Sequence, residues 1–148
     1  MRFIHTADLH LGKRLHDMPL LEDQIYMLDE LRKLAIARGA DAVMIAGDVY
    51  QSSSPPSEAM SAFDGFVTAL AAAGIRVFAV SGNHDSERRV AYLASLVRGS
   101  GIYVSERFTG TLQQFTMEDE HGEIVVSLLP FIKPINVRRC YPRETIES

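Results

Sequence analysis

Short apolar runs without polar alternation mark the first half of the chain, at residues 3–4, 42–46 and 77–80. Uninterrupted runs of this kind are typical of strands that are buried on both faces of a parallel sheet. Between and after these runs, apolar residues recur at steps of three and four, which is the spacing of one face of a helix. The pattern therefore predicts that strands and helices alternate along this part of the chain.

Residues that favour helix ends bound the three predicted helices. Gly39, Gly74 and Gly99 are expected to end them, while Ser54 and Ser86 are expected to begin the second and third. The apolar positions of these helices are Leu21, Ile25, Leu28, Leu31, Ala35, Met60, Phe63, Val67, Leu70, Val90, Leu93 and Val97.

The second half of the chain has more strand-like segments. Residues 102–104, 111–115 and 124–129 are typical of strands, and the polar stretch 118–123 predicts a hairpin turn. Because crossovers between parallel strands are nearly always right-handed, the first half should form a layered α/β unit. We therefore expect an α/β fold over residues 1–148 as one domain, a layered sheet flanked by helices with a more β-rich C-terminal segment.

Composition supports one globular domain, since 47% of the 148 residues are apolar and 23% are charged. No apolar run approaches the roughly 20 residues that cross a bilayer, and the first segment lacks a signal-peptide pattern, so we expect a cytoplasmic protein without membrane contact. The single cysteine, Cys140, excludes an internal disulfide and a zinc ribbon. A net charge of −4 gives no global attraction for nucleic acid, so any such contact would have to be local.

Polar clusters follow each of the first three predicted strands. They are the segments 8–10 (Asp-Leu-His), 47–48 (Gly-Asp) and 82–85 (Gly-Asn-His-Asp). The carboxyl ends of parallel strands lie at one edge of a sheet, which is where such folds bind ligands. The clusters should therefore meet in space although they are far apart in sequence.

The chemistry of these clusters predicts a metal site. Bringing Asp8 and Asp48 together would cost about 4 kcal/mol at about 4 Å in an effective dielectric of about 20, unless a positive charge lies between them. The clusters contain no Lys or Arg, whereas His10, Asn83 and His84 add imidazole and amide groups. This mixture suits Mn²⁺, Fe²⁺ or Zn²⁺, and two such ions could bind a phosphoryl oxygen and activate a water. Phosphoester hydrolysis is the reaction that this arrangement favours.

The ordered set of DxH, GD and GNHD motifs resembles the calcineurin-like metallophosphoesterase superfamily. More narrowly, the segments 5–12, 46–50, 54–56, 82–86 and 130–131 are similar to the SbcD-type subunits of bacterial DNA repair exonucleases. The resemblance implies that Asp8, His10 and Asp48 hold one Mn²⁺ and that Asp48 and Asn83 hold a second. It also implies that His84 contacts the scissile phosphate and assists protonation of the leaving group.

The same resemblance implies a DNA nuclease subunit that works with an SbcC-like coiled-coil ATPase, often as a homodimer. The family's site is completed by a later histidine and a GHxH motif, and nothing after Asn83 supplies either. His121 is the only later histidine, and it follows Glu120 in the acidic stretch, so we do not assign it to the metals. The sequence thus predicts the N-terminal part of the domain, truncated before these motifs, with one ion or none bound.

Candidate substrate contacts beyond the clusters are His16, Arg88 and Arg89, although a solvated position is the simpler account of each. Two functional alternatives stay open beside the DNA nuclease. One is a small-molecule phosphodiesterase or phosphatase of the same superfamily. The other is a catalytically incomplete fragment that acts only in binding or dimerisation.

Overall fold

A four-stranded parallel sheet forms the centre of the computed structural model, which describes residues 1–91 and 97–142, except the side chain of Arg88. Its strands are β1 (Phe3–Thr6), β4 (Ala42–Ala46), β5 (Arg76–Val80) and β6 (Ile102–Val104), in the order β1-β4-β5-β6. Residues pair in parallel register, for example Phe3 with Ala42 and Ala42 with Arg76. The α/β class predicted from the strand and helix pattern is confirmed.

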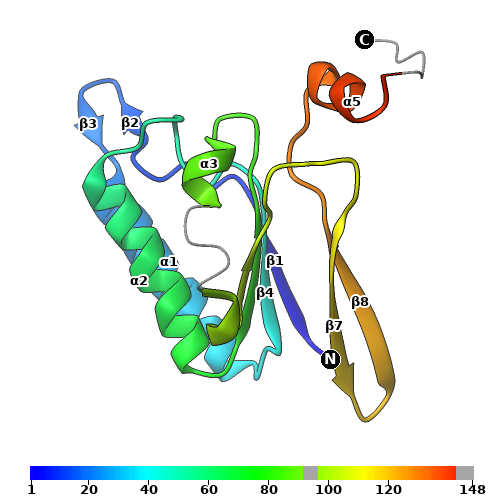
Figure 1. The fold of residues 1–148 in the computed structure, drawn as a ribbon. Helices are drawn as coiled ribbons and strands as arrows, with labels where there is room; N and C mark the ends of the chain where they lie inside the picture. Colours follow the sequence, from blue (N-terminus) through cyan, green and yellow to red (C-terminus); the bar gives the residue numbers. More distant parts are fainter. Residues whose placement is uncertain (92–96, 143–148) are drawn as a thin grey trace.

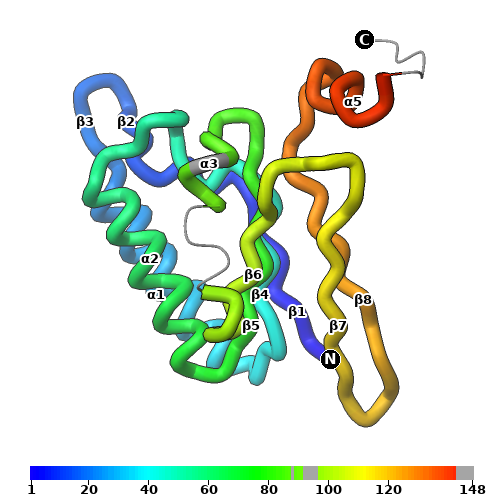
Figure 2. Tube along the Cα trace, viewed as in Figure 1, coloured from blue at the N-terminus to red at the C-terminus, as the bar shows by residue number. Residues whose placement is uncertain are grey.

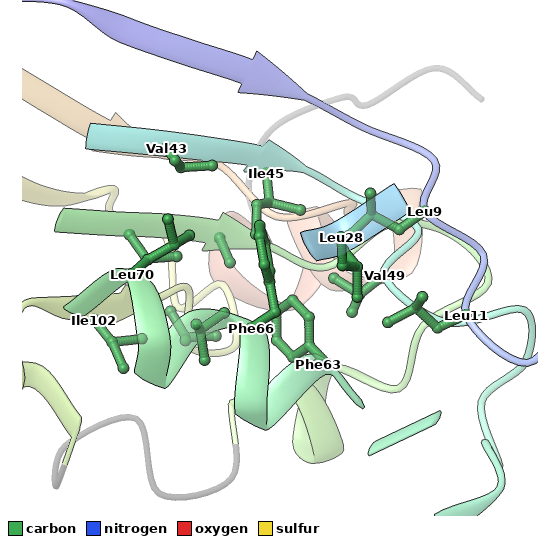
Figure 3. Packing of buried hydrophobic residues seen from close by; sticks show 14 of the residues in the cluster. Leu9, Leu11, Leu28, Val43, Ile45, Val49, Phe63, Phe66, Leu70 and Ile102 are labelled. Atoms are coloured by element: carbon green, nitrogen blue, oxygen red, sulfur yellow. The ribbon is translucent and has the colours of Figure 1, made fainter. Parts of the chain in front are cut away.

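Two long helices, α1 (Leu21–Ala37) and α2 (Ser57–Ala72), cover one face of this sheet (Figure 1). Their apolar stripes pack on the sheet because a helix with one apolar face must bury it against another element. Figure 3 shows the resulting core, in which Phe63, Phe66 and Leu70 of α2 lie against Val43 and Ile45 of β4. We call this packing the helix-side core.

An antiparallel hairpin, β7 (Gln113–Asp119) and β8 (Gly122–Leu128), covers the opposite face of the sheet. Its buried residues Met117 and Leu128 pack with Ala42 and Phe78 of the sheet, and we call this packing the hairpin-side core. Phe78 stacks on Tyr103 with ring centroids 4.8 Å apart, which adds aromatic packing to this smaller core.

Short elements gather around the edge where the parallel strands end (Figure 2). They are β2 (Arg14–Leu15), β3 (Met18–Pro19), α3 (Glu87–Val90) and α5 (Pro134–Cys140). A short 3-10 turn, η1 (Arg98–Ser100), precedes β6. This edge of the sheet is therefore surrounded by short strands and short helices.

The structure corrects four local predictions. Among the described strands β1 pairs with β4 alone, so it is an edge strand, and with Phe3 36% exposed it is not buried on both faces. α2 begins at Ser57 without a side-chain cap, so Ser54 does not cap it, and Met60 is exposed. The hairpin turn is limited to residues 120–121, because the flanking residues of the acidic stretch continue the ladder of β7 and β8.

The predicted third helix begins after Ser86 as expected, and most of its remaining length, residues 92–96, lies outside the described residues. α3 ends at Val90, and Leu93 lies outside the described residues. Within the described part of the chain, no helix has the length and apolar character needed to span a membrane.

Candidate metal centre

The loops after β1 and β4 run side by side beyond the ends of their strands. The backbone N–H of Asp8 donates to the carbonyl of Gly47 at 3.1 Å, and that of His10 donates to the carbonyl of Asp48 at 2.9 Å. The next residue, Leu11, donates to Val49 at 2.9 Å. These bonds extend the parallel pairing of the two strands, and they fix Asp8 and His10 opposite Asp48.

Asp8, His10 and Asp48 bring their ligand atoms together within 4.8 Å of one another. His10 Nε2 lies 3.7 Å from Asp8 Oδ1 and 3.8 Å from Asp48 Oδ2. Asp48 is buried, His10 is partly buried and the Asp8 side chain is exposed. The cluster therefore opens to solvent on the side of Asp8.

The donor set fits a divalent transition metal. Metal–ligand bonds of about 2.1 Å allow two donors of one ion to lie up to about 4.2 Å apart, which covers both nitrogen–oxygen distances around His10 Nε2. Two carboxylates and one imidazole suit Mn²⁺, Fe²⁺ or Zn²⁺. No Lys or Arg forms an ion pair with Asp8 or Asp48 among the described residues, so a cation between them would relieve their repulsion.

All three of these residues have an unusual backbone conformation. The φ angles of Asp8, His10 and Asp48 are 56°, 45° and 48°, in the left-handed region. Residues other than glycine occupy this region at a cost, and such residues concentrate at functional sites. The local backbone is thus bent so that three side chains converge.

Two glycines allow the loops after β4 and β5 to touch. Gly47 has a φ of +88°, and a Cβ built on it would lie 3.1 Å from the Cα of Gly82. A Cβ on Gly82 would lie 2.1 Å from Asp48 Oδ1 and 2.3 Å from Asp48 N. Position 47 therefore requires glycine because of its backbone conformation. Position 82 requires glycine because Asp48 occupies the space that a side chain would need.

Asp85 ties these two loops together, a role that the sequence motif did not reveal. Its carboxylate accepts hydrogen bonds from the backbone N–H groups of Val49 at 3.0 Å, Tyr50 at 2.9 Å and Gly82 at 2.9 Å. These partners lie on both loops, so a single side chain satisfies donors that a turn would otherwise leave unpaired. Burial, with smaller contributions from the charges of Asp85 and Asp64, raises the pKa of Tyr50 to about 12, which keeps its phenol neutral.

His84 and Asn83 come from the loop after β5. The backbone N–H of His84 donates to Asp48 Oδ1 at 3.0 Å, which places this loop against the carboxylate cluster. The His84 ring is exposed, its Nδ1 lies 3.3 Å from the carbonyl of Gln51, and its centroid is 5.1 Å from that of His10. Asn83 is exposed and lines a cavity of about 280 Å³ next to His84.

Gln24 of α1 is a second residue whose part in this site the sequence analysis did not identify. Its Nε2 donates to the carbonyls of Leu9 at 3.0 Å and His10 at 2.8 Å, and its Oε1 accepts from Gly12 N at 3.0 Å. Gln24 lies three residues after Leu21 and four before Leu28, so it is a polar residue at a position of the buried face. That misplaced polarity is the signal that could have identified it.

Two of the three candidate substrate contacts, His16 and Arg89, lie outside this cluster. His16, with a φ of 53°, is exposed at the turn between β2 and β3. Arg89 is exposed and lines a different cavity of about 340 Å³, together with Tyr50 and Phe63. The side chain of Arg88 lies outside the described part of the chain.

Comparison with known protein families agrees with this geometry. The family model of the calcineurin-like phosphoesterases matches residues 1–143, which is nearly the whole chain and includes all three polar clusters. Members of this family bind divalent metals and hydrolyse phosphoesters. The chain belongs to the calcineurin-like phosphoesterase family.

Proposed function

We propose that this chain carries the metal-binding part of a DNA nuclease, which hydrolyses phosphodiesters in a Mn²⁺-dependent reaction. The observation that carries the proposal is the convergence of Asp8, His10 and Asp48, whose ligand atoms lie within 4.8 Å at the carboxyl edge of the sheet. Membership of a phosphoesterase family supports the type of reaction. The similarity to SbcD-type subunits across several motifs supports DNA as the substrate.

In this proposal Asp8, His10 and Asp48 hold one ion, while Asp48 and Asn83 are the ligands that this chain offers toward the second ion of a complete family site. A bound divalent ion would supply Lewis acidity toward a phosphoryl oxygen and would lower the pKa of a nucleophilic water. Asp48 is central because its Oδ2 faces His10 while its Oδ1 accepts the bond from His84 N. Its carboxylate therefore links the first loop to the loop that carries Asn83.

His84 acts on the phosphate and the leaving group. A carbonyl can only accept a hydrogen bond, so the contact of His84 Nδ1 with Gln51 O requires a proton on Nδ1. The neutral ring then has Nε2 free to take up a proton, and the protonated ring can donate that proton to the departing oxygen. The exposure of the ring leaves it accessible to a substrate.

An SbcC-like coiled-coil ATPase as partner and a homodimer complete the proposal, on the basis of the motif similarity. Sedimentation velocity tests the second point directly, and a clean monomer at micromolar concentration would contradict the homodimer. Co-elution of the chain with an SbcC-like ATPase from the same genome tests the first point, and separate elution at low salt would contradict it.

A binding-only role is the second candidate, and the ligand set favours it. In the described residues, the only group of at least three His, Cys, Asp or Glu side chains that could hold a metal is Asp8, His10 and Asp48. The second ion would thus rest on Asp48 and Asn83 alone. This candidate predicts metal binding without hydrolysis of any phosphoester, even at high Mn²⁺.

Calorimetric titration with Mn²⁺, run beside cleavage of a fluorescent duplex oligonucleotide, tests the proposal. Asp48→Asn should abolish Mn²⁺ binding and cleavage, and His84→Ala should abolish cleavage while it leaves Mn²⁺ binding intact. Asp23→Asn is the matched control, because Asp23 is an exposed carboxylate of α1 outside the cluster.

The substrate that is hydrolysed distinguishes the DNA nuclease, the small-molecule phosphodiesterase and the binding-only role. Cleavage of the duplex supports the nuclease, whereas hydrolysis of cyclic nucleotides with an intact duplex identifies a small-molecule phosphodiesterase. Binding of Mn²⁺ without turnover identifies the binding-only role. Equal cleavage by the wild type, Asp48→Asn and His84→Ala would refute the assignment of the site.

A further inference from the structure

A cavity of about 280 Å³ opens beside the loop that carries Asn83 and His84. Its volume is near the lower end of the range for small-molecule sites, so it suits one compact chemical group. The walls come from four separate segments of the chain, which follow β4, β5, β6 and β8. The lining residues include Asn83, Glu87, Arg107, Phe131 and Lys133.

Two of these segments are attached by hydrogen bonds to the end of β5 and the residue after it. The backbone N–H of Phe131 donates to the carbonyl of Ser81 at 2.8 Å, and that of Ser105 donates to the carbonyl of Ala79 at 2.9 Å. Ser81 N in turn donates to Ser105 Oγ at 3.4 Å. The wall that contains Arg107 and Phe131 is therefore held at a fixed place next to the Asn83 loop.

The charges in the cavity leave a cationic side available. The Asp85 carboxylate is taken up by three backbone N–H groups, and Glu87 accepts a bond from Asn136 at 3.4 Å. Arg107 Nε lies 4.0 Å from Glu87 Oε2, beyond hydrogen-bond distance, so this contact does not occupy the N–H donors of the guanidinium. The Lys133 side chain is exposed, and its ammonium group forms no hydrogen bond or ion pair within the described residues, so its charge can attract an anion.

An aromatic ring lies on the same wall as these cations. Phe131 lines the cavity with 45% of its surface exposed, although its backbone is fixed by the bond to Ser81. An exposed ring on a fixed backbone offers a face for a planar base. Stacking on such rings does not depend on the nucleotide sequence. A ring beside Lys133 and Arg107 thus matches the two parts of a nucleotide, which are a base and a phosphate.

We propose that this cavity binds one nucleotide unit of the substrate, with its base on Phe131 and its phosphate on Lys133 and Arg107. The inference rests on the proposed function and deepens it, because the cavity is separated from His84 by no more than the neighbouring residue Asn83. It assigns the substrate to nucleoside-containing phosphodiesters and not to simple phosphate esters. Asn83 lines the cavity, and the next residue, His84, donates its backbone N–H to Asp48 of the metal cluster.

NMR titrations of the metal-free protein with three probes test this inference without any contribution from a bound metal. The probes are thymidine monophosphate, deoxyribose 5-phosphate and inorganic phosphate, which differ by the base and the sugar. Thymidine monophosphate should bind on the order of tenfold more tightly than deoxyribose 5-phosphate, because only the former stacks on Phe131. Phe131→Ala should remove this difference.

Substitution of the cations should have a different pattern. Lys133→Gln and Arg107→Gln should weaken all three probes by similar factors, since each probe keeps its phosphate. Leu129→Ala and Arg139→Gln are matched controls, because both residues are exposed and neither lines the cavity. Neither control should change the affinity for any probe.

The outcomes distinguish this inference from the proposed function. Equal affinity for thymidine monophosphate and deoxyribose 5-phosphate, or no effect of Phe131→Ala, overturns the nucleotide site whether or not Mn²⁺ binds. If the wild type binds Mn²⁺ but not the nucleotide, the metal centre stands and the inference fails. If it binds the nucleotide in the expected pattern but no Mn²⁺, the nucleotide site stands and the proposed hydrolysis fails.

Discussion

The two faces of the parallel sheet contribute different parts of the site. The loops after β1 and β4, which carry Asp8, His10 and Asp48, contribute four residues to the helix-side core: Leu9, Leu11, Val49 and Tyr50. Gln24 of α1 adds hydrogen bonds to the first of these loops. The hairpin side contributes Phe131 after β8, which lines the nucleotide-sized cavity. The helical layer therefore supports the loops that carry Asp8, His10 and Asp48, while the segment after the hairpin supplies Phe131 to the proposed nucleotide cavity.

Substitutions near the loops of the metal cluster should therefore change Mn²⁺ affinity more than substitutions in the hairpin-side core. Gly82→Ala should have the largest effect, because its Cβ would lie 2.1 Å from Asp48 Oδ1 and 2.3 Å from Asp48 N. The loop must move, so we expect loss of Mn²⁺ binding in calorimetry. Urea denaturation should show a free energy of unfolding lower by about 3 kcal/mol.

Gly65→Ala is the control for Gly82→Ala. Gly65 lies within α2, and a Cβ there would meet nothing within 4 Å, so the free energy of unfolding should rise by about 0.5–1 kcal/mol. Mn²⁺ binding should be unchanged. A Gly82→Ala protein with normal Mn²⁺ affinity would show that the close approach of the two loops is not needed.

Asp85→Asn should have the second largest effect. The amide keeps one acceptor oxygen and presents an NH₂ group to backbone donors, so N–H groups of Val49, Tyr50 or Gly82 lose their partner. We expect a loss of about 1–3 kcal/mol in stability and at least about tenfold weaker Mn²⁺ binding. Lower stability with unchanged Mn²⁺ affinity would limit Asp85 to a role in folding.

Gln24→Ala should weaken Mn²⁺ binding by a smaller factor, about threefold to tenfold. It removes the hydrogen bonds to Leu9, His10 and Gly12, while Asp8 and His10 keep their backbone bonds to the loop after β4. The exposed Glu22→Ala in the same helix is the control. Identical titration curves for both variants would contradict a positioning role for Gln24.

Leu128→Ala should leave Mn²⁺ affinity unchanged, which is the smallest effect in this series. Leu128 is 5% exposed in the hairpin-side core, so its truncation should lower the free energy of unfolding by about 2–3 kcal/mol in urea denaturation. No residue of the loops that carry Asp8, His10 and Asp48 belongs to that core. A loss of Mn²⁺ affinity at temperatures where the variant is folded would refute the division between the two faces.

Local patterns in the sequence were sufficient to predict the central sheet. The runs 42–46 and 102–104 match β4 and β6 residue for residue, since a short apolar run between helices has few alternatives to a buried strand. The edge position of β1 was not predicted, because its exposure depends on which strands pair with it. The hairpin turn was predicted at 118–123 and lies at 120–121 within that stretch, since the polar side chains there suit solvent-exposed strand positions as well as a turn.

Much of the candidate site could also be anticipated, for a topological reason. Asp8, His10 and Asp48 meet because parallel strands deliver their carboxyl ends to one edge. The contacts that hold this arrangement were not visible in the sequence, because the bonds of Gln24 and Asp85 join segments brought together only by packing. The roles of Asn83 and His84 remain predictions, which the metal and cleavage assays address.

The left-handed backbone of Asp8, His10 and Asp48 lowers the stability of the folded chain in order to place three candidate metal ligands. Each such residue costs on the order of 1–3 kcal/mol, and glycine would adopt the same conformation at less cost. Selection of a random library for thermal stability alone, without metal, should therefore favour glycine at positions 8 and 10. Selection in the presence of Mn²⁺ should retain Asp and His, because an ion that binds only the folded state repays the strain.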